Sequence, residues 1–101
     1  MSTPDDARLA PAAHVKAQPL EDRGVLVNLR TGRCFELNQA GFEIWRLITE
    51  GGSQASIAAA LAARYALAPE VSDRDVRALV GLLVAEGLVE VTGAPNEMKM
   101  T

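Results

Sequence analysis

The stretch that decides the fold is Gly24-Val-Leu-Val-Asn-Leu-Arg-Thr-Gly-Arg-Cys-Phe-Glu-Leu-Asn38. Its first part, Gly24 to Leu29, is rich in aliphatic and β-branched residues, which favour an extended strand. Arg30-Thr31-Gly32-Arg33 follows as a hairpin turn, because glycine adopts a positive φ without a steric penalty. The chain returns as Cys34 to Leu37, where alternate side chains lie on opposite faces. The stretch therefore predicts an antiparallel hairpin.

Three helices are predicted after the hairpin. Asn38 can cap the first, because its side-chain oxygen can accept a hydrogen bond from an amide one turn further on. The second is predicted from a cap at Ser53 to Tyr65, with apolar residues at steps of three and four. The third is predicted from Ser72-Asp73-Arg74-Asp75, which resembles a capping box, to Gly87, a candidate left-handed residue at its end.

The segments around this centre are weaker in pattern. His14 to Leu20 is predicted to be a short edge strand, and Leu88 to Val91 a last extended segment. Residues 1–12 and 92–101 are expected to be flexible arms, which leaves a folded domain over residues 13–91. The order predicts an α+β fold that resembles a winged helix-turn-helix, with a three-stranded antiparallel sheet followed by three helices.

Composition limits the classes of function. The chain has 101 residues, enough for one domain, with a net charge of −3 and a pI near 5.0. Because nucleic-acid affinity depends largely on Lys and Arg, no nucleic-acid partner is expected. A single cysteine excludes an internal disulfide and indicates a reducing compartment. No run approaches the roughly 20 apolar residues that span a bilayer, so we expect a cytoplasmic protein with no membrane partner.

Groups for catalysis are scarce. The single histidine is His14 and the single cysteine is Cys34. A Cys-His dyad is conceivable, but an exposed polar His14 and a small, partly buried Cys34 explain both residues more simply. No phosphate-binding loop is present either. The sequence therefore predicts no catalytic residue, no metal site and no cofactor, and hence a protein that is not an enzyme.

A winged-helix transcriptional regulator remains the alternative, because such a fold reads the major groove of DNA with one helix. The predicted third helix carries Arg74 and Arg77, but Asp73, Asp75 and Glu86 outnumber them. A helix with net negative charge is a poor partner for phosphates. DNA binding is thus the less favoured hypothesis.

Four pieces of the sequence follow one another in a characteristic order. They are the hairpin stretch with Thr31-Gly-Arg-Cys-Phe-Glu-Leu-Asn38, the step Gly41-Phe-Glu-Ile-Trp45, the stripe around Ile57, and Asp75-Val-Arg-Ala-Leu79 with Gly87-Leu-Val89. Together they resemble the PqqD-like family, whose members are RiPP recognition elements, small domains that bind the leader segments of precursor peptides. The resemblance covers residues 25–91.

The resemblance implies that a leader peptide adds as a further antiparallel strand beside the third strand, in a groove against the third helix. The peptide-binding residues that it implies on the strand are Arg33, Cys34, Phe35, Glu36 and Leu37. Those that it implies on the helix are Arg74, Val76, Arg77, Leu79, Val80, Leu83 and Val84. Arg33, Arg74 and Arg77 are expected to meet acidic residues of the leader.

Two partner assignments follow from the resemblance. One is a chaperone of pyrroloquinoline-quinone biosynthesis, which presents its precursor to a radical enzyme. The other is the free-standing element of lasso-peptide pathways, which presents a leader to a cysteine protease and a cyclase. The Thr31-Gly32 turn followed by Arg-x-Phe-x-Leu-Asn looks more like the lasso type.

Overall fold

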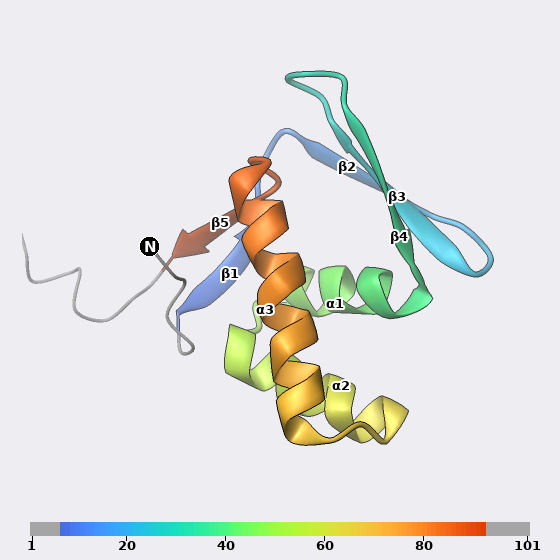
Figure 1. Ribbon diagram of the computed structural model, residues 1–101. Helices are drawn as coiled ribbons and strands as arrows, with labels where there is room; N and C mark the ends of the chain where they lie inside the picture. Colours follow the sequence, from blue (N-terminus) through green and yellow to red (C-terminus); the bar gives the residue numbers. More distant parts are fainter. Residues whose placement is uncertain (1–6, 93–101) are drawn as a thin grey trace, which may run out of the picture.

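The computed structural model describes residues 7–92. The elements in chain order are β1 (Arg8–Pro11), β2 (Val15–Pro19), β3 (Arg23–Asn28), β4 (Cys34–Asn38), α1 (Gln39–Thr49), α2 (Gln54–Tyr65), α3 (Pro69–Ala85) and β5 (Val89–Thr92). Figure 1 shows α3 between the sheet of β2, β3 and β4 and the pair of β1 and β5. The predicted α+β fold, with a three-stranded antiparallel sheet followed by three helices, is confirmed.

The larger sheet has the strand order β2-β3-β4, and both pairings are antiparallel. The turn between β3 and β4 forms as predicted, with Gly32 at a φ of +82°. The Asn28 side-chain oxygen accepts hydrogen bonds from the turn amides of Arg30 and Thr31, at 2.9 and 3.3 Å. Among residues 7–92, β4 pairs only on its β3 side and is therefore an edge strand of this sheet.

The second sheet corrects the expected N-terminal arm. β1 pairs antiparallel with β5, and the register runs from Arg8 opposite Thr92 to Pro11 opposite Val89. Leu9 is 1% exposed, and its amide donates to the Gly52 carbonyl at 3.2 Å. The expectation of a flexible arm is therefore wrong for residues 7–12. A strand of four residues has too little alternation to be recognised, and its pairing partner lies at the far end of the chain. The remaining arm and tail, residues 1–6 and 93–101, lie outside the described residues, whereas Thr92 belongs to β5.

Two of the three predicted helix starts are confirmed. The Gly41 amide donates to Asn38 Oδ1 at 2.8 Å, and Ser53 and Ser56 form a reciprocal capping box at the start of α2. The predicted start of α3 at Ser72 is wrong, because the helix begins at Pro69, a residue whose fixed φ suits the first helical turn. Ser72 is fully buried and donates its hydroxyl to the Ala58 carbonyl at 2.6 Å.

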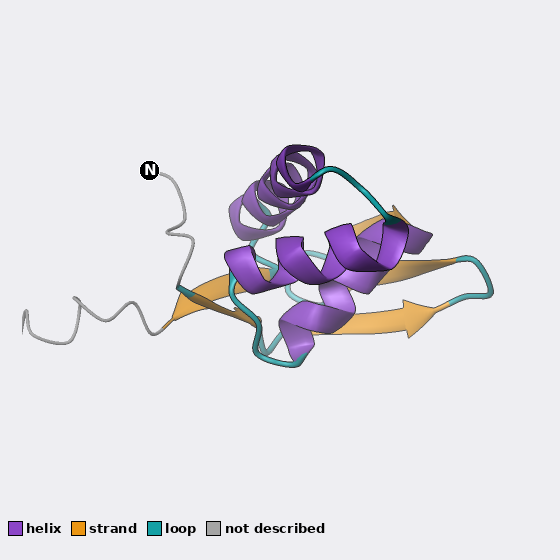
Figure 2. Cartoon of the chain, turned by 90° about the horizontal axis from the view of Figure 1, so that it is seen from below, coloured by secondary structure: helices purple, strands orange, loops and turns teal. Residues whose placement is uncertain are grey.

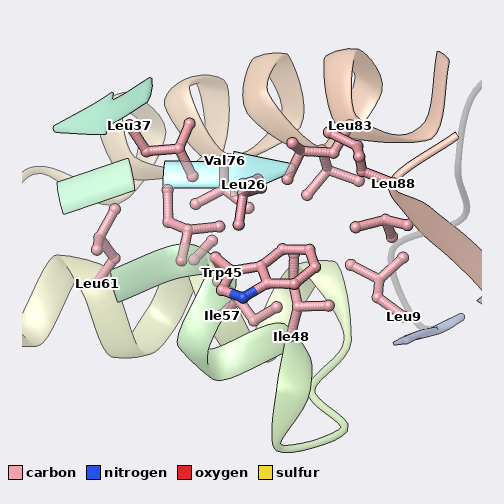
Figure 3. Packing of buried hydrophobic residues seen from close by; sticks show 14 residues of the cluster. Leu9, Leu26, Leu37, Trp45, Ile48, Ile57, Leu61, Val76, Leu83 and Leu88 are labelled. Carbon is pink, nitrogen blue, oxygen red and sulfur yellow. The ribbon is translucent and has the colours of Figure 1, made fainter. Parts of the chain in front are cut away.

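A single hydrophobic core joins the two sheets and the helices. Trp45 of α1 and Leu26 of β3 lie near its centre, and Leu9 and Leu88 lie at the end formed by β1 and β5 (Figure 3). Figure 2 shows the two small sheets at opposite ends of the helices. The common core fixes β4 and α3 relative to each other, and these two elements form the candidate site.

Candidate functional site

The edge of β4 offers backbone hydrogen-bonding groups at alternate residues. The Asn28 amide donates to the Arg33 carbonyl at 2.9 Å, and in an antiparallel ladder bonded and non-bonded pairs alternate from such a point. Phe35 and Leu37 therefore direct their amides and carbonyls to β3. Cys34 and Glu36 direct theirs away from the sheet, where they are available to another strand.

A groove of about 620 Å³ lies beside this edge. One wall is a single stripe of α3, formed by Asp75, Ala78, Leu79 and Leu82. These residues share a helix face because their spacing is three, four and seven. The rest of the lining comes from β4, α1, α2 and the segment after α2, namely Glu36, Leu37, Asn38, Ala40, Gly41, Ile44, Leu61, Tyr65 and Leu67. Most of these side chains are apolar, so the groove suits apolar side chains of a guest.

The sheet is tied to the C-terminal end of α3 at the hairpin turn, which we call the closed end of the groove. Arg33 forms an ion pair with the Glu86 carboxylate at 2.9 Å, and the Arg33 guanidinium lies 5.2 Å from the centre of the Phe35 ring. Asn28 Nδ2 donates to the Glu86 carbonyl at 3.3 Å. His14 Nε2 lies 2.9 Å from the Gly87 carbonyl oxygen. These contacts tie β3, the hairpin turn and the residue before β2 to the C-terminal end of α3.

The other end of the groove, where Asn38 and Asp75 lie, we call the open end. A second hollow of about 450 Å³ continues along β4 and is lined by Asp22, Arg23, Glu36, Leu37 and Asn38. Glu36 in this hollow forms an ion pair with Arg23 at 2.5 Å. The groove and this second hollow therefore both border the residues from Glu36 to Asn38 of β4.

The structure distributes the predicted strand residues over this site. Glu36 and Leu37 line the groove, and Arg33 lies at its closed end. Phe35 is half-buried against the core. Cys34 is exposed, so the simpler expectation of a partly buried cysteine is wrong.

The predicted helix residues divide into three groups. Val76, Val80 and Leu83 are 0% exposed and belong to the core, where a peptide cannot reach them in this conformation. Val84 is half-buried against the same core, whereas Leu79 lines the groove. Arg74 and Arg77 are exposed and face aspartates of their own helix, Asp75 at 4.0 Å and Asp73 at 2.8 Å. Of the seven helix residues, the structure places only Leu79 in the lining.

The groove stripe of α3 was missed because the apolar residues of this helix belong to two adjacent faces. Val76, Val80 and Leu83 point into the core, while Leu79 and Leu82 lie one face further round. Leu82 is 48% exposed, and a large apolar residue outside the core stripe was the signal that could have found it. The lining from α1 and α2 carries no comparable signal, because it depends on how the helices pack.

The described residues alone bear on metal-binding groups, the Cys-His pair and membrane-spanning helices. Within residues 7–92 no three His, Cys, Asp or Glu side chains are arranged to hold a metal ion. His14 contacts the Gly87 carbonyl and the Cys34 thiol contacts the Gly32 carbonyl, so the two do not form a dyad. Over the same part of the chain, no helix is long and apolar enough to cross a membrane.

Residues 23–89 match the family described as coenzyme PQQ synthesis protein D (PqqD). TbiB1, solved in complex with the TbiA(β) leader peptide, is 30% identical with a TM-score of 0.76, and the match covers 83% of this chain and 98% of that one. No curated protein matches the sequence.

Two more distant structures share the fold. Lasso peptide synthetase B1, solved in complex with the leader peptide, is 24% identical with a TM-score of 0.73, and the match covers 81% of this chain and 96% of that one. The PqqD truncation of Methylobacterium extorquens PqqCD, described as a functional and stand-alone RiPP recognition element, is 18% identical with a TM-score of 0.73. That match covers 88% of this chain and 95% of the other.

Proposed function

The chain belongs to the PqqD family, and from this premise we propose that it binds the leader segment of a ribosomally made precursor peptide and presents it to modifying enzymes. The leader pairs with β4 as an additional antiparallel strand and lies in the groove against α3. The protein itself supplies no catalytic group and no cofactor, and acts in the cytoplasm, where such precursors are made.

The observation that carries this proposal is the open edge of β4 beside an apolar groove. The outward amides and carbonyls of Cys34 and Glu36 give affinity for any extended backbone. Side chains of the added strand alternate in direction, so every second one enters the groove lined by Leu37, Leu79 and Leu82. Backbone pairing and side-chain selection are therefore separate functions of two neighbouring surfaces.

The similarity to TbiB1 supports the same occupant, because that protein was solved with a leader peptide and is 30% identical over most of this chain. A lasso-peptide pathway, in which the partners are a cysteine protease and a cyclase, is the first assignment, and it rests on the resemblance of the Thr31-Gly32 turn and the residues that follow it. A pathway of the pyrroloquinoline-quinone type, with a radical enzyme as partner, is the second assignment. The DNA-binding alternative gains nothing from the structure, since Arg74 and Arg77 face aspartates within α3.

The experiment is amide hydrogen exchange followed by NMR, with and without the leader half of a precursor peptide encoded beside this protein. In the free protein we expect fast exchange at Cys34 and Glu36 and protection at Phe35 and Leu37, because only the latter donate to β3. The leader should protect Cys34 and Glu36 as well. Unchanged exchange at both residues with saturating leader would refute strand addition.

A matched pair of variants tests the backbone contact. Glu36→Pro removes the outward amide without removing a bond to β3, whereas Glu36→Ala keeps that amide. Both variants lose the ion pair with Arg23. We expect Glu36→Pro to weaken leader binding about tenfold, since one backbone hydrogen bond is worth about 1 kcal/mol. Glu36→Ala should bind nearly as wild type, with urea midpoints showing that both variants fold.

A further inference from the structure

One stripe of α3 lines the groove and continues beyond it to the C-cap residue, with a carboxylate at each end of the stripe. Asp75, Leu79, Leu82 and Glu86 follow one another at steps of four, three and four, so they lie in line on the helix. The two leucines form the apolar middle of the wall. The two acidic residues therefore mark the open and the closed end.

The carboxylate at the closed end is bridged to the sheet. Arg33, the last residue of the turn before β4, reaches Glu86 at 2.9 Å, and 26% of the Glu86 side chain is exposed. A basic side chain next to an extended strand thus meets the acidic C-cap residue of α3, just beyond the Leu82 end of the groove lining. At this end, an arginine beside the strand is therefore close enough to α3 to form an ion pair with it.

The carboxylate at the open end has no such bridge within residues 7–92. Asp75 lines the groove, and its ion pair in this part of the chain is with Arg74, its neighbour in the same helix, at 4.0 Å. Consecutive helix residues do not face each other, so this pair is weak. Glu36, the other acidic residue of the lining, is held by Arg23. Asp75 is therefore the charge of the lining that remains open to a guest.

We propose that the groove selects an extended peptide segment with a Lys or Arg at the end that lies beside Asp75, next to apolar side chains over Leu79 and Leu82. This inference rests on the proposed function and specifies the chemistry of the guest. It replaces the expectation that Arg33, Arg74 and Arg77 attract an acidic leader, because each of them already faces an acidic residue of this chain. The basic residue of the guest forms an ion pair with Asp75 at the open end, just as Arg33 forms one with Glu86 at the closed end.

The test is a selection of displayed random 12-residue peptides on four proteins: the wild type, Asp75→Lys, Asp73→Asn and Leu82→Glu. Asp73→Asn is the control for position, because it removes a carboxylate from the same helix outside the groove, where Asp73 pairs with Arg77. We expect wild type and Asp73→Asn to enrich a basic residue beside an apolar pair. Asp75→Lys should enrich an acidic residue at that position.

The best wild-type peptide is then synthesised with its basic residue intact and with norleucine in that place. Against the wild type, norleucine should weaken binding about threefold at low salt, as expected for an exposed ion pair. Against Asp75→Asn, the same change should have no effect. Equal losses on both proteins, or the same basic preference on Asp75→Lys, would overturn the inference.

Leu82→Glu separates this inference from the proposed function. Leu82 is half-exposed in the groove, so the variant should fold while placing a charge among the apolar contacts. If the selected peptides bind Leu82→Glu more weakly than the wild type but bind the Asp75 variants as tightly as the wild type, only the charge selection is refuted. Strand addition then remains supported. Peptides that bind Leu82→Glu as tightly as the wild type, or no enriched peptide at all, would contradict both.

Discussion

Gly24 allows β3 to pass directly beside the aromatic ring of Phe42. A Cβ built at this glycine would overlap the ring, whereas a Cβ at Gly81 of α3 would meet no atom within 4 Å. We expect Gly24→Ala to lower the free energy of unfolding by about 1–3 kcal/mol through overpacking. Gly81→Ala should raise it by about 0.5–1 kcal/mol, because alanine loses less entropy in a helix. Urea unfolding of both variants measures the difference, and equal stabilities would contradict the close approach.

Asn28 is 4% exposed and links the hairpin turn to α3. Its side chain accepts from the Arg30 and Thr31 amides and donates to the Glu86 carbonyl. Asn28→Ala leaves these groups without their partner, and we expect a loss of about 2 kcal/mol in the free energy of unfolding.

His14→Ala is the comparison for Asn28→Ala, because it removes the neighbouring tether to the Gly87 carbonyl from a more exposed position. We expect it to cost less than about 1 kcal/mol. The same urea measurement compares the two variants. A loss at His14 that equals the loss at Asn28 would show that the closed end does not depend chiefly on Asn28.

At the scale of elements, β1 is the strand whose contribution can be measured most directly. Leu9 is fully buried, so Leu9→Ala should cost about 2–4 kcal/mol, within the range for buried leucines. Leu20→Ala changes the same residue type at a position that is 43% exposed, and it should cost less than about 1 kcal/mol. A flexible arm would make both variants equally stable in urea unfolding.

The elements also show where prediction from sequence fails. The hairpin of β3 and β4 and the caps at Asn38 and Ser53 were predicted because their signals are local. The start of α3 was misplaced because a local capping signal at Ser72 competes with a tertiary contact, and the buried hydroxyl donates to Ala58 instead. β1 was missed because its signal exists only in its pairing with β5.

The sequence predicts a groove between β4 and α3, but it does not predict which residues of α3 line that groove. The edge strand followed from the family resemblance, and Glu36, Leu37 and Leu79 do line the groove. Periodicity identifies the apolar stripe of a helix that packs into the core. In α3 that stripe is Val76, Val80 and Leu83, which are expected from the sequence to contact the peptide. Which neighbouring stripe faces a groove depends on the angle between α3 and the sheet, and no single segment of the sequence encodes that angle.

At the scale of the whole molecule, one core connects every element, and Trp45 lies inside it. We therefore expect cooperative two-state unfolding in urea, in which the fluorescence of this single tryptophan and the far-UV circular dichroism change together. A fluorescence transition at lower urea than the loss of helix would show that the sheets and the helices unfold separately.

The pairing of β1 with β5 has a consequence for how this domain can be joined to other proteins. Arg8 and Thr92 are register partners, so the chain enters and leaves the described unit at adjacent points, about 5 Å apart between Cα atoms. Figure 1 shows this pair on the opposite side of α3 from β4. The unit can therefore be inserted into a surface loop of a larger enzyme, or circularly permuted by a short linker, without obstructing the edge that receives a guest.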